Sequence, residues 1–142
     1  MTISALVLTK NEEEMIEDCL KQLKFADEIV IVDQNSVDNT LKIAKKYTDR
    51  VFKSSANDFA QNRNTLKDQA GGEWLLYIDA DERLPQELVK EIKTAIAKKE
   101  FNAFYIPRKN YVLGKWVRHG GWWPDYAPRL FKKSKLEKWP FF

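Results

Sequence analysis

The sequence predicts an α/β fold in which a mostly parallel central sheet is flanked by helices. Short apolar runs rich in β-branched residues alternate with segments that carry apolar residues at helical spacing. The apolar runs lack a polar alternation, which is typical of parallel strands buried on both faces. Four such strand–helix units precede residue 100, so we expect a doubly wound arrangement in this part of the chain.

Each expected element follows from its local pattern. Asn11 is expected to cap the first helix, with glutamates in its first turn near the positive end of the dipole. Ser36 or Asp38 should cap the second helix, and Asn35 can adopt the left-handed conformation needed in the turn before it. The expected strands are 3–9, 28–33, 51–54 and 73–79, and the expected helices are 10–24, 35–47, 56–70 and 84–99.

The size and composition of the chain indicate one globular domain, residues 1–142. Its 142 residues are 44% hydrophobic and 32% charged, which suits a packed core. No apolar window is long enough for a membrane span and no secretion signal opens the sequence, so we expect a cytoplasmic protein. The single Cys19 lies among helix-spaced apolar residues and is expected to be core.

Charge and aromatic residues are distributed unevenly along the chain. Residues 101–142 hold nine Lys or Arg against two acids, a net +7, whereas the whole chain carries +3, so residues 1–100 carry −4. Twelve of the 18 aromatic residues also lie in 101–142, a region that reads as strands and loops. A basic segment of this kind could face nucleic acid, an anionic membrane surface or a phosphorylated substrate.

Three polar residues end apolar strands. Thr9, Asp33 and Asp79 each occupy the last position of an expected strand. In open α/β sheets, ligands bind beyond the carboxyl ends of the strands. We therefore expect these three side chains to converge at a ligand site.

The stretch "LLYIDADE" brings three carboxylates to one of these strand ends. Asp79 and Asp81 can point the same way while Ala80 turns back toward the sheet. Two converging carboxylates repel each other unless a cation intervenes, and Mg²⁺ or Mn²⁺ with substrate phosphates would satisfy them. Glu82 would start the following helix or support the site. A solvated loop whose acids cap a helix is the alternative.

Four ordered motifs, "LVLTKNEE", "IVIVDQNSVDNT", "FAQNRN" and "LLYIDADE", resemble the nucleotide-sugar-binding half of family 2 glycosyltransferases. That family has the Rossmann-like A-type fold. The segment "HGGWWPDYAPRLFKK" resembles the branch that builds lipopolysaccharide core oligosaccharide. The resemblance implies a nucleotide-sugar half, 1–100, and an aromatic-rich acceptor segment, 101–142.

The resemblance also implies roles for individual residues. Asp33 would face the base, Arg63 would approach the base or diphosphate, and Asp79 would touch the ribose or metal. Asp81 would be the metal ligand, with Mn²⁺ or Mg²⁺ as cofactor. The residues lining the nucleoside site would be Thr9, Asn11, Glu12 and Asp33.

The resemblance further implies inversion by direct displacement, which requires a base opposite the leaving group. Asp125 is our candidate because it is one of two acids in the basic region and lies in "GGWWPDY", after two glycines and two tryptophans. A structural turn acid after Pro124 is the alternative. The candidate contacts for acceptor or diphosphate are Arg129, His119, Trp122 and Trp123.

The sequence thus predicts a metal-dependent inverting glycosyltransferase that moves a sugar from a uridine donor to a saccharide or lipid-linked acceptor of a bacterial surface glycan. We expect no nucleic-acid partner, and a peripheral contact with the anionic inner face of the membrane is a candidate. Gln34, Asn35 and Val37 depart from the family's second motif, and family members generally run on past this point, so a C-terminally truncated form is expected.

Two rival functions fit parts of the pattern. A haloacid dehalogenase-like phosphotransferase would use Asp79 as nucleophile and Asp81 as acid, but that motif normally ends the first strand of its domain. A non-catalytic nucleotide-sugar-binding module, or an inactive homologue, would keep the nucleotide site without turnover.

Overall fold

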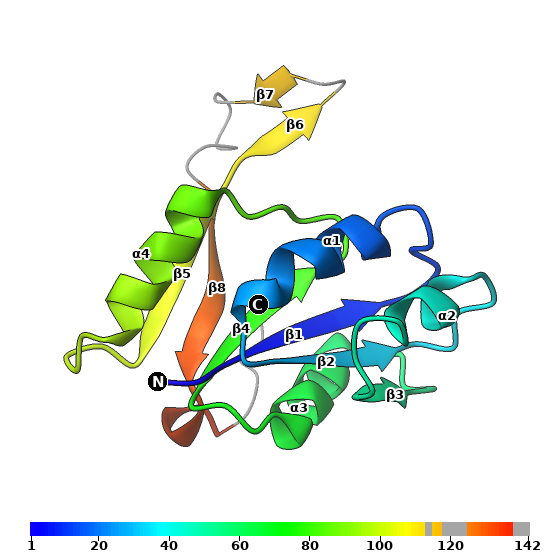
Figure 1. Ribbon diagram of the computed structural model, residues 1–142, viewed down its shortest axis with the longest axis horizontal. Coiled ribbons are helices and arrows are strands. Elements are labelled where there is room, and N and C mark those ends of the chain that lie inside the picture. The colour runs from blue at the N-terminus through cyan, green and yellow to red at the C-terminus, as the bar shows by residue number, and fades with distance from the viewer. Residues whose placement is uncertain (113–114, 118–124, 138–142) are drawn as a thin grey trace.

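The computed structural model describes residues 1–112, 115–117 and 125–137, and for 110–112, 115–117 and 125 it describes the backbone alone. Strands and helices alternate through the first hundred residues, as predicted (Figure 1). The strands are β1 (Ile3–Thr9), β2 (Glu28–Asp33), β3 (Val51–Lys53), β4 (Trp74–Asp79), β5 (Ala103–Arg108), β6 (Asn110–Val112), β7 (Lys115–Val117) and β8 (Asp125–Lys132). The helices are α1 (Ile16–Gln22), α2 (Thr40–Ala44), α3 (Phe59–Gln69) and α4 (Gln86–Ile96), with short 3₁₀ turns η1 (Leu23–Phe25) and η2 (Lys133–Lys135).

The central sheet has the order β3-β2-β1-β4-β8-β5. Strands β1 to β4 run parallel to one another, whereas β8 runs antiparallel to both β4 and β5. Thr9 pairs with Asp33, and Leu8 pairs with Asp79, so the three predicted polar strand ends do meet at one edge. The mostly parallel sheet is confirmed.

Two hydrophobic clusters cover the two faces of the sheet. One face packs against α1, α2 and α4 through side chains such as Leu20, Ala44 and Ile92. The other face packs against α3, where Leu66 meets Leu75 and its neighbours. The apolar strands without polar alternation predict a sheet that is covered on both faces, and the two clusters confirm it.

Beyond this sheet, β6 and β7 form an antiparallel pair that projects from the top of the molecule in Figure 1. The backbone of Asp125 opens β8, opposite Arg108 on β5. The predicted base, the Asp125 side chain, and the predicted contacts His119, Trp122 and Trp123 lie outside what the structure describes. Among the described helices, none has the length and apolar character needed to span a bilayer.

The prediction that Asn11 caps the first helix is wrong. Helix α1 begins only at Ile16, and its N-cap, Met15, makes no side-chain cap bond. Asn11 instead adopts a left-handed conformation, with φ 51°, and its side-chain oxygen accepts a bond from the Val37 N–H. The Asn11 side chain therefore bonds the loop after β2 and not the end of α1. Asn adopts the left-handed conformation more readily than most residues do.

Candidate functional site

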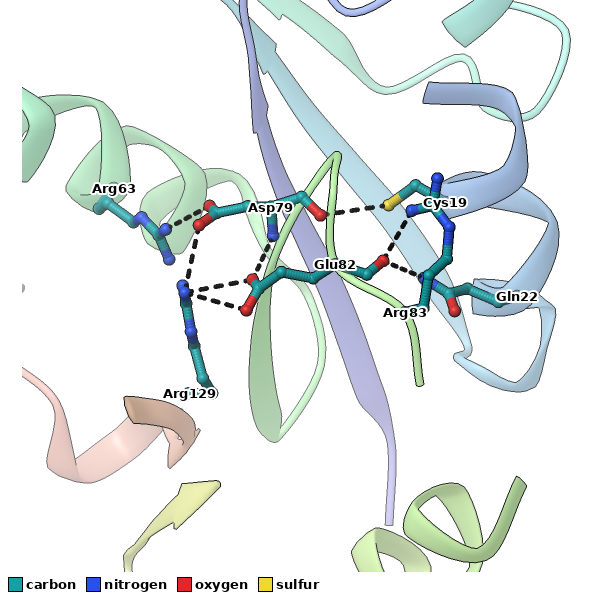
Figure 2. A network of polar contacts seen from close by, with 7 residues as sticks. All are labelled: Cys19, Gln22, Arg63, Asp79, Glu82, Arg83 and Arg129. Carbon is teal, nitrogen blue, oxygen red and sulfur yellow. Dashed lines mark hydrogen bonds and ion pairs between the residues drawn. The ribbon is translucent and has the colours of Figure 1, made fainter. Parts of the chain in front are cut away.

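At the carboxyl end of β4, two arginines from distant parts of the chain hold the Asp79 carboxylate (Figure 2). Arg63 on α3 donates from Nη2 to Oδ1 at 2.7 Å, and Arg129 on β8 donates from Nη2 to Oδ2 at 3.1 Å. The Arg63 side chain is 1% exposed, the Arg129 side chain 8% and the Asp79 side chain 35%. Both oxygens of Asp79 are therefore paired, while about a third of the side chain still faces solvent.

The adjacent Glu82 completes this cluster. Its Oε1 accepts a bond from the Asp79 N–H at 2.8 Å, and its own N–H donates to the Asp79 carbonyl at 3.0 Å. Arg129 Nη2 lies 3.1 Å from Oε1 and 3.2 Å from Oε2 of Glu82. Burial raises the pKa of Glu82, although Arg129 and the Asp79 N–H favour the charged form. Arg129 thus bridges two carboxylates at once.

Aromatic rings flank Arg63, the other arginine of the cluster. Its guanidinium carbon lies 4.5 Å from the ring centroid of Phe59 and 5.0 Å from that of Tyr77. Burial lowers the pKa of Arg63 to about 10, with Asp79 acting in the opposite direction. The guanidinium therefore stays charged near neutral pH and needs its carboxylate partner.

The turn that follows Asp79 is also fixed from the side of α1 (Figure 2). Gln22 Nε2 donates to the Glu82 carbonyl at 2.8 Å, and Gln22 Oε1 accepts a bond from the Leu84 N–H at 2.7 Å. Arg83 donates to the Met15 carbonyl at 3.1 Å. Contacts from α1, α3 and β8 therefore converge on residues 79–84.

This turn leaves Asp81 toward solvent. Strand β4 ends at Asp79, as predicted, and Asp81 lies in the turn that follows the strand. Ala80 is nevertheless buried, at 2% exposure, as predicted. Asp81 is the carboxylate of this motif that stays exposed.

The loop after β2 is built around a buried aspartate. Asp33 is 1% exposed, and its two oxygens accept bonds from the Ser36 N–H at 2.9 Å and the Ser36 hydroxyl at 2.6 Å. Asn35 has φ 53°, which confirms the left-handed turn expected there. An aspartate that bonds the backbone shortly after itself is a common way to hold a tight turn.

The loop after β1 is joined to this loop by hydrogen bonds from backbone N–H groups to side chains, two of which are the carboxylates of Asp38 and Glu13. The Asn11 N–H donates to the Ser36 hydroxyl and the Glu12 N–H to the Thr40 hydroxyl, each at 2.8 Å. The Val37 N–H donates to the Asn11 side chain at 2.9 Å. Two neighbouring strand ends thus share one hydrogen-bonded platform.

Two features of this edge suit a polar ligand that carries a cation. Thr9 is 2% exposed, and among the described residues its hydroxyl has no hydrogen-bond partner. Burial raises the pKa of Glu12, and the charges of Asp81, Asp38 and Asp79 raise it further. Glu12 in the β1 loop and Asp79 and Asp81 at the end of β4 therefore repel one another electrostatically across this edge.

A divalent cation fits these donors chemically, because carboxylate oxygens are the ligands that Mg²⁺ and Mn²⁺ favour. The part of the chain that the structure describes holds no group of three or more His, Cys, Asp or Glu residues arranged for a metal. Asp81, with Glu12 nearby, would hold the ion only together with oxygens from another molecule. Such sharing is usual when substrate phosphates complete the shell.

Most of the predicted site residues therefore lie along one edge. The strand ends and their loops provide Thr9, Asn11, Glu12, Asp33, Asp79 and Asp81, while Arg63 and Arg129 reach Asp79 from α3 and β8. Gln22 and Ser36 were not predicted as parts of the site. Ser36 could have been found from the Asp-x-x-Ser spacing, whereas no local pattern marks Gln22.

The chain belongs to glycosyl transferase family 2, since the family model matches residues 4–142. It is 29% identical over 120 residues to the lipopolysaccharide core biosynthesis glycosyltransferase LpsC of Rhizobium meliloti, a match that covers 80% of this chain and 44% of LpsC. The chain spans 33% to 44% of the length of the curated glycosyltransferases of Rickettsia species, to which it is 29% to 35% identical.

Solved structures show the same fold. Staphylococcus aureus TarS in complex with UDP-GlcNAc superposes with a TM-score of 0.72 at 24% identity, over 94% of this chain and 46% of that chain. A mannosyltransferase of Pyrobaculum calidifontis, in complex with GDP-Man and Mn²⁺, gives a TM-score of 0.63 at 23% identity, over 71% of this chain and 34% of that chain. The A-type glycosyltransferase fold expected from the sequence is confirmed.

Proposed function

We propose that this chain binds a nucleoside diphosphate sugar, with uridine as the base, and transfers the sugar with inversion to a saccharide or glycolipid acceptor. The observation that carries the proposal is the meeting of Asp33, Asp79 and Asp81 at the carboxyl edge of a parallel sheet in a family 2 chain. The uridine donor is supported by TarS, which was solved with UDP-GlcNAc, and a role in lipopolysaccharide core synthesis by the similarity to LpsC.

In this proposal the loops after β1 and β2 receive the nucleoside. Thr9 offers a buried hydroxyl without a partner among the described residues, and Asp33 lies at the next strand end to face the base. On the other side of β1, Asp79, whose side chain is 35% exposed, would face the ribose and diphosphate, and the buried Arg63 would hold it there. Hydrogen bonds already fix Asp33, Arg63 and Asp79, so these groups can orient the donor without being ordered by it.

Asp81 would hold Mn²⁺ or Mg²⁺ against the diphosphate, and the solved mannosyltransferase with Mn²⁺ supports this choice of ion. When bound, the metal supplies positive charge where the departing diphosphate gains negative charge. Asp125 would take the proton from the acceptor hydroxyl, and Trp122, Trp123 and His119 would contact the acceptor. Asp125→Asn should then abolish turnover while nucleotide binding persists.

The test is thermal unfolding of the protein with Mn²⁺ and a panel of UDP, UDP-GlcNAc and GDP-mannose. A ligand present at 100 times its dissociation constant stabilises the folded state by about 2.7 kcal/mol. Asp81→Asn should lose the metal-dependent part of that stabilisation. Asp68→Asn, which removes a carboxylate of α3 that is 70% exposed, is the matched control and should keep it.

A nucleotide that stabilises the protein equally with and without metal would contradict the metal-dependent mechanism. No stabilisation by any nucleotide would overturn the proposed function altogether. Release of nucleoside diphosphate in the presence of acceptor separates a transferase from a module that only binds.

A further inference from the structure

The sequence alone suggests that Arg129 contacts diphosphate or acceptor, but its geometry points elsewhere. Its Nη2 lies within 3.2 Å of oxygens on both Asp79 and Glu82, and the side chain is 8% exposed. A guanidinium that is buried and bridges two carboxylates has little surface left for a ligand. Its position suits a group that fixes other side chains.

We infer that Arg129 and Glu82 are positioning residues, which fix the turn at residues 79–84 so that Asp79 stays on Arg63 and Asp81 faces the ligand. This inference rests on the proposed function. It assigns to β8, in the C-terminal third of the chain, a role in shaping the nucleotide site of the first hundred residues.

The hydrogen-bond pattern supports this role. Glu82 Oε1 accepts the Asp79 N–H and also lies 3.1 Å from Arg129 Nη2, so one oxygen serves both the backbone of the turn and the bridge. Arg129 in turn occupies Asp79 Oδ2, which leaves Oδ1 to Arg63. Loss of Arg129 would leave two neighbouring carboxylates without their shared cation, and they would repel each other.

The charges of the four residues balance. Arg63 and Arg129 offset Asp79 and Glu82, so the cluster itself is close to neutral in net charge. Removing one partner leaves an uncompensated charge in a partly buried place, whereas removing one cation and one anion together restores the balance. This difference separates positioning from direct ligand contact.

The experiment compares Arg129→Met with the double variant Arg129→Met/Glu82→Gln, using the full chain. The amide introduced by Glu82→Gln can still accept the Asp79 N–H through its oxygen, and its NH₂ can donate to Asp79 Oδ2 in place of Arg129. The first measurement is the affinity for Mn²⁺ with UDP, by calorimetry. The second, which needs no ligand, is hydrogen exchange of the Asp79 N–H.

We expect Arg129→Met to weaken Mn²⁺–UDP binding by about 10- to 100-fold, the usual effect of losing a group that supports a metal ligand. Exchange of the Asp79 N–H should become faster. The double variant should recover most of both losses. Lys132→Met removes a positive charge from the same strand and should change neither the Mn²⁺–UDP affinity nor the exchange of the Asp79 N–H. This control excludes the explanation that any loss of positive charge weakens binding.

If the double variant remains as weak as Arg129→Met while the Asp79 N–H is again protected, Arg129 contacts the ligand directly and the inference is wrong. It is also wrong if Arg129→Met leaves both measurements unchanged. Should the unaltered protein bind no UDP, the proposed function fails, and the exchange of the Asp79 N–H in the two variants still decides whether the bridge holds the turn.

Discussion

The loops that follow β1 and β2 differ from the turn that follows β4 in what holds them. Hydrogen bonds between backbone N–H groups and side chains of the two loops join the first two, as when Asn11 bonds Val37 and Ser36 and when Glu13 accepts the Asn39 N–H. Charged side chains from α3 and β8 hold the third, through Asp79. Asn11 and Ser36 lie 25 residues apart, whereas Arg129 is 50 residues from Asp79.

The first two loops are thus held by contacts close in sequence, whereas the turn after β4 is held by contacts from distant segments. The hydrogen-bonded platform of the β1 and β2 loops needs only the first two strand–helix units, so it can form once β1 and β2 pair. The charged cluster needs β8 in place beside β4. We therefore expect changes in the charged cluster to have large effects, and changes in the platform to have smaller ones.

The largest expected effect is that of Asp79→Asn. This change leaves the buried Arg63 and Arg129 without their shared carboxylate, and it should lower the free energy of unfolding by about 2 to 3 kcal/mol. Urea denaturation measures the change. Asp81→Asn is the matched control two positions along, and because Asp81 is exposed it should alter stability by less than about 0.5 kcal/mol. If the two variants lost equal free energy of unfolding, the proposal that Asp79 is held by the charged cluster and Asp81 is not would be wrong.

Asn11→Ala should have an intermediate effect. Alanine disfavours the φ of 51° and cannot accept the Val37 N–H, so we expect a loss of about 1 to 2 kcal/mol in the free energy of unfolding, measured by the same urea denaturation. Asn11→Gly keeps the backbone conformation accessible and loses only the side-chain bond, so its cost should be smaller. If glycine costs as much as alanine, the left-handed conformation contributes nothing.

The smallest effect is expected at Glu28, at the opposite end of the sheet, where neutral donors and one arginine meet a carboxylate. Burial would raise its pKa, but bonds from the Ser4 hydroxyl and the Gly71 N–H, each 2.5 Å long, and the charge of Arg50 place the pKa of Glu28 below its usual value. A lowered pKa stabilises the fold above the unfolded-state value of about 4.3, and this contribution is lost as the pH falls through the folded-state value.

Glu28→Gln should therefore cost about 0.5 to 1 kcal/mol at pH 7, and the difference from the unaltered protein should shrink below about pH 4. Chemical denaturation at a series of pH values measures it. A difference that grows as the pH falls would show that the sign of the pKa shift is wrong.

Much of the first hundred residues could be predicted from the sequence because their signals are local. The apolar runs of β1, β2 and β4 lack polar alternation, and the carboxyl ends of parallel strands must meet at one edge, which brings Thr9, Asp33 and Asp79 together. Asn11 was misjudged because its partner, Val37, lies in another loop. A cap was the only role that neighbouring residues could suggest.

The support of Asp79 by Arg129 could not be predicted in the same way. It depends on the insertion of β8 between β4 and β5, a pairing between distant segments that no hydrophobic period specifies. Gln22 likewise reaches the turn from α1 across 60 residues of sequence. Contacts of this kind follow from the assembled fold and not from any short motif.

The antiparallel pairing of β8 with β4 has a further consequence during synthesis of the chain. The ribosome delivers β4 long before residues 125–132, so until β8 arrives β4 offers an unpaired edge with apolar residues such as Leu75 and Leu76. Open apolar edges recruit strands from other chains. A nascent chain at this stage is thus prone to aggregate. By pairing with β4, β8 covers this edge and also places Arg129 beside Asp79.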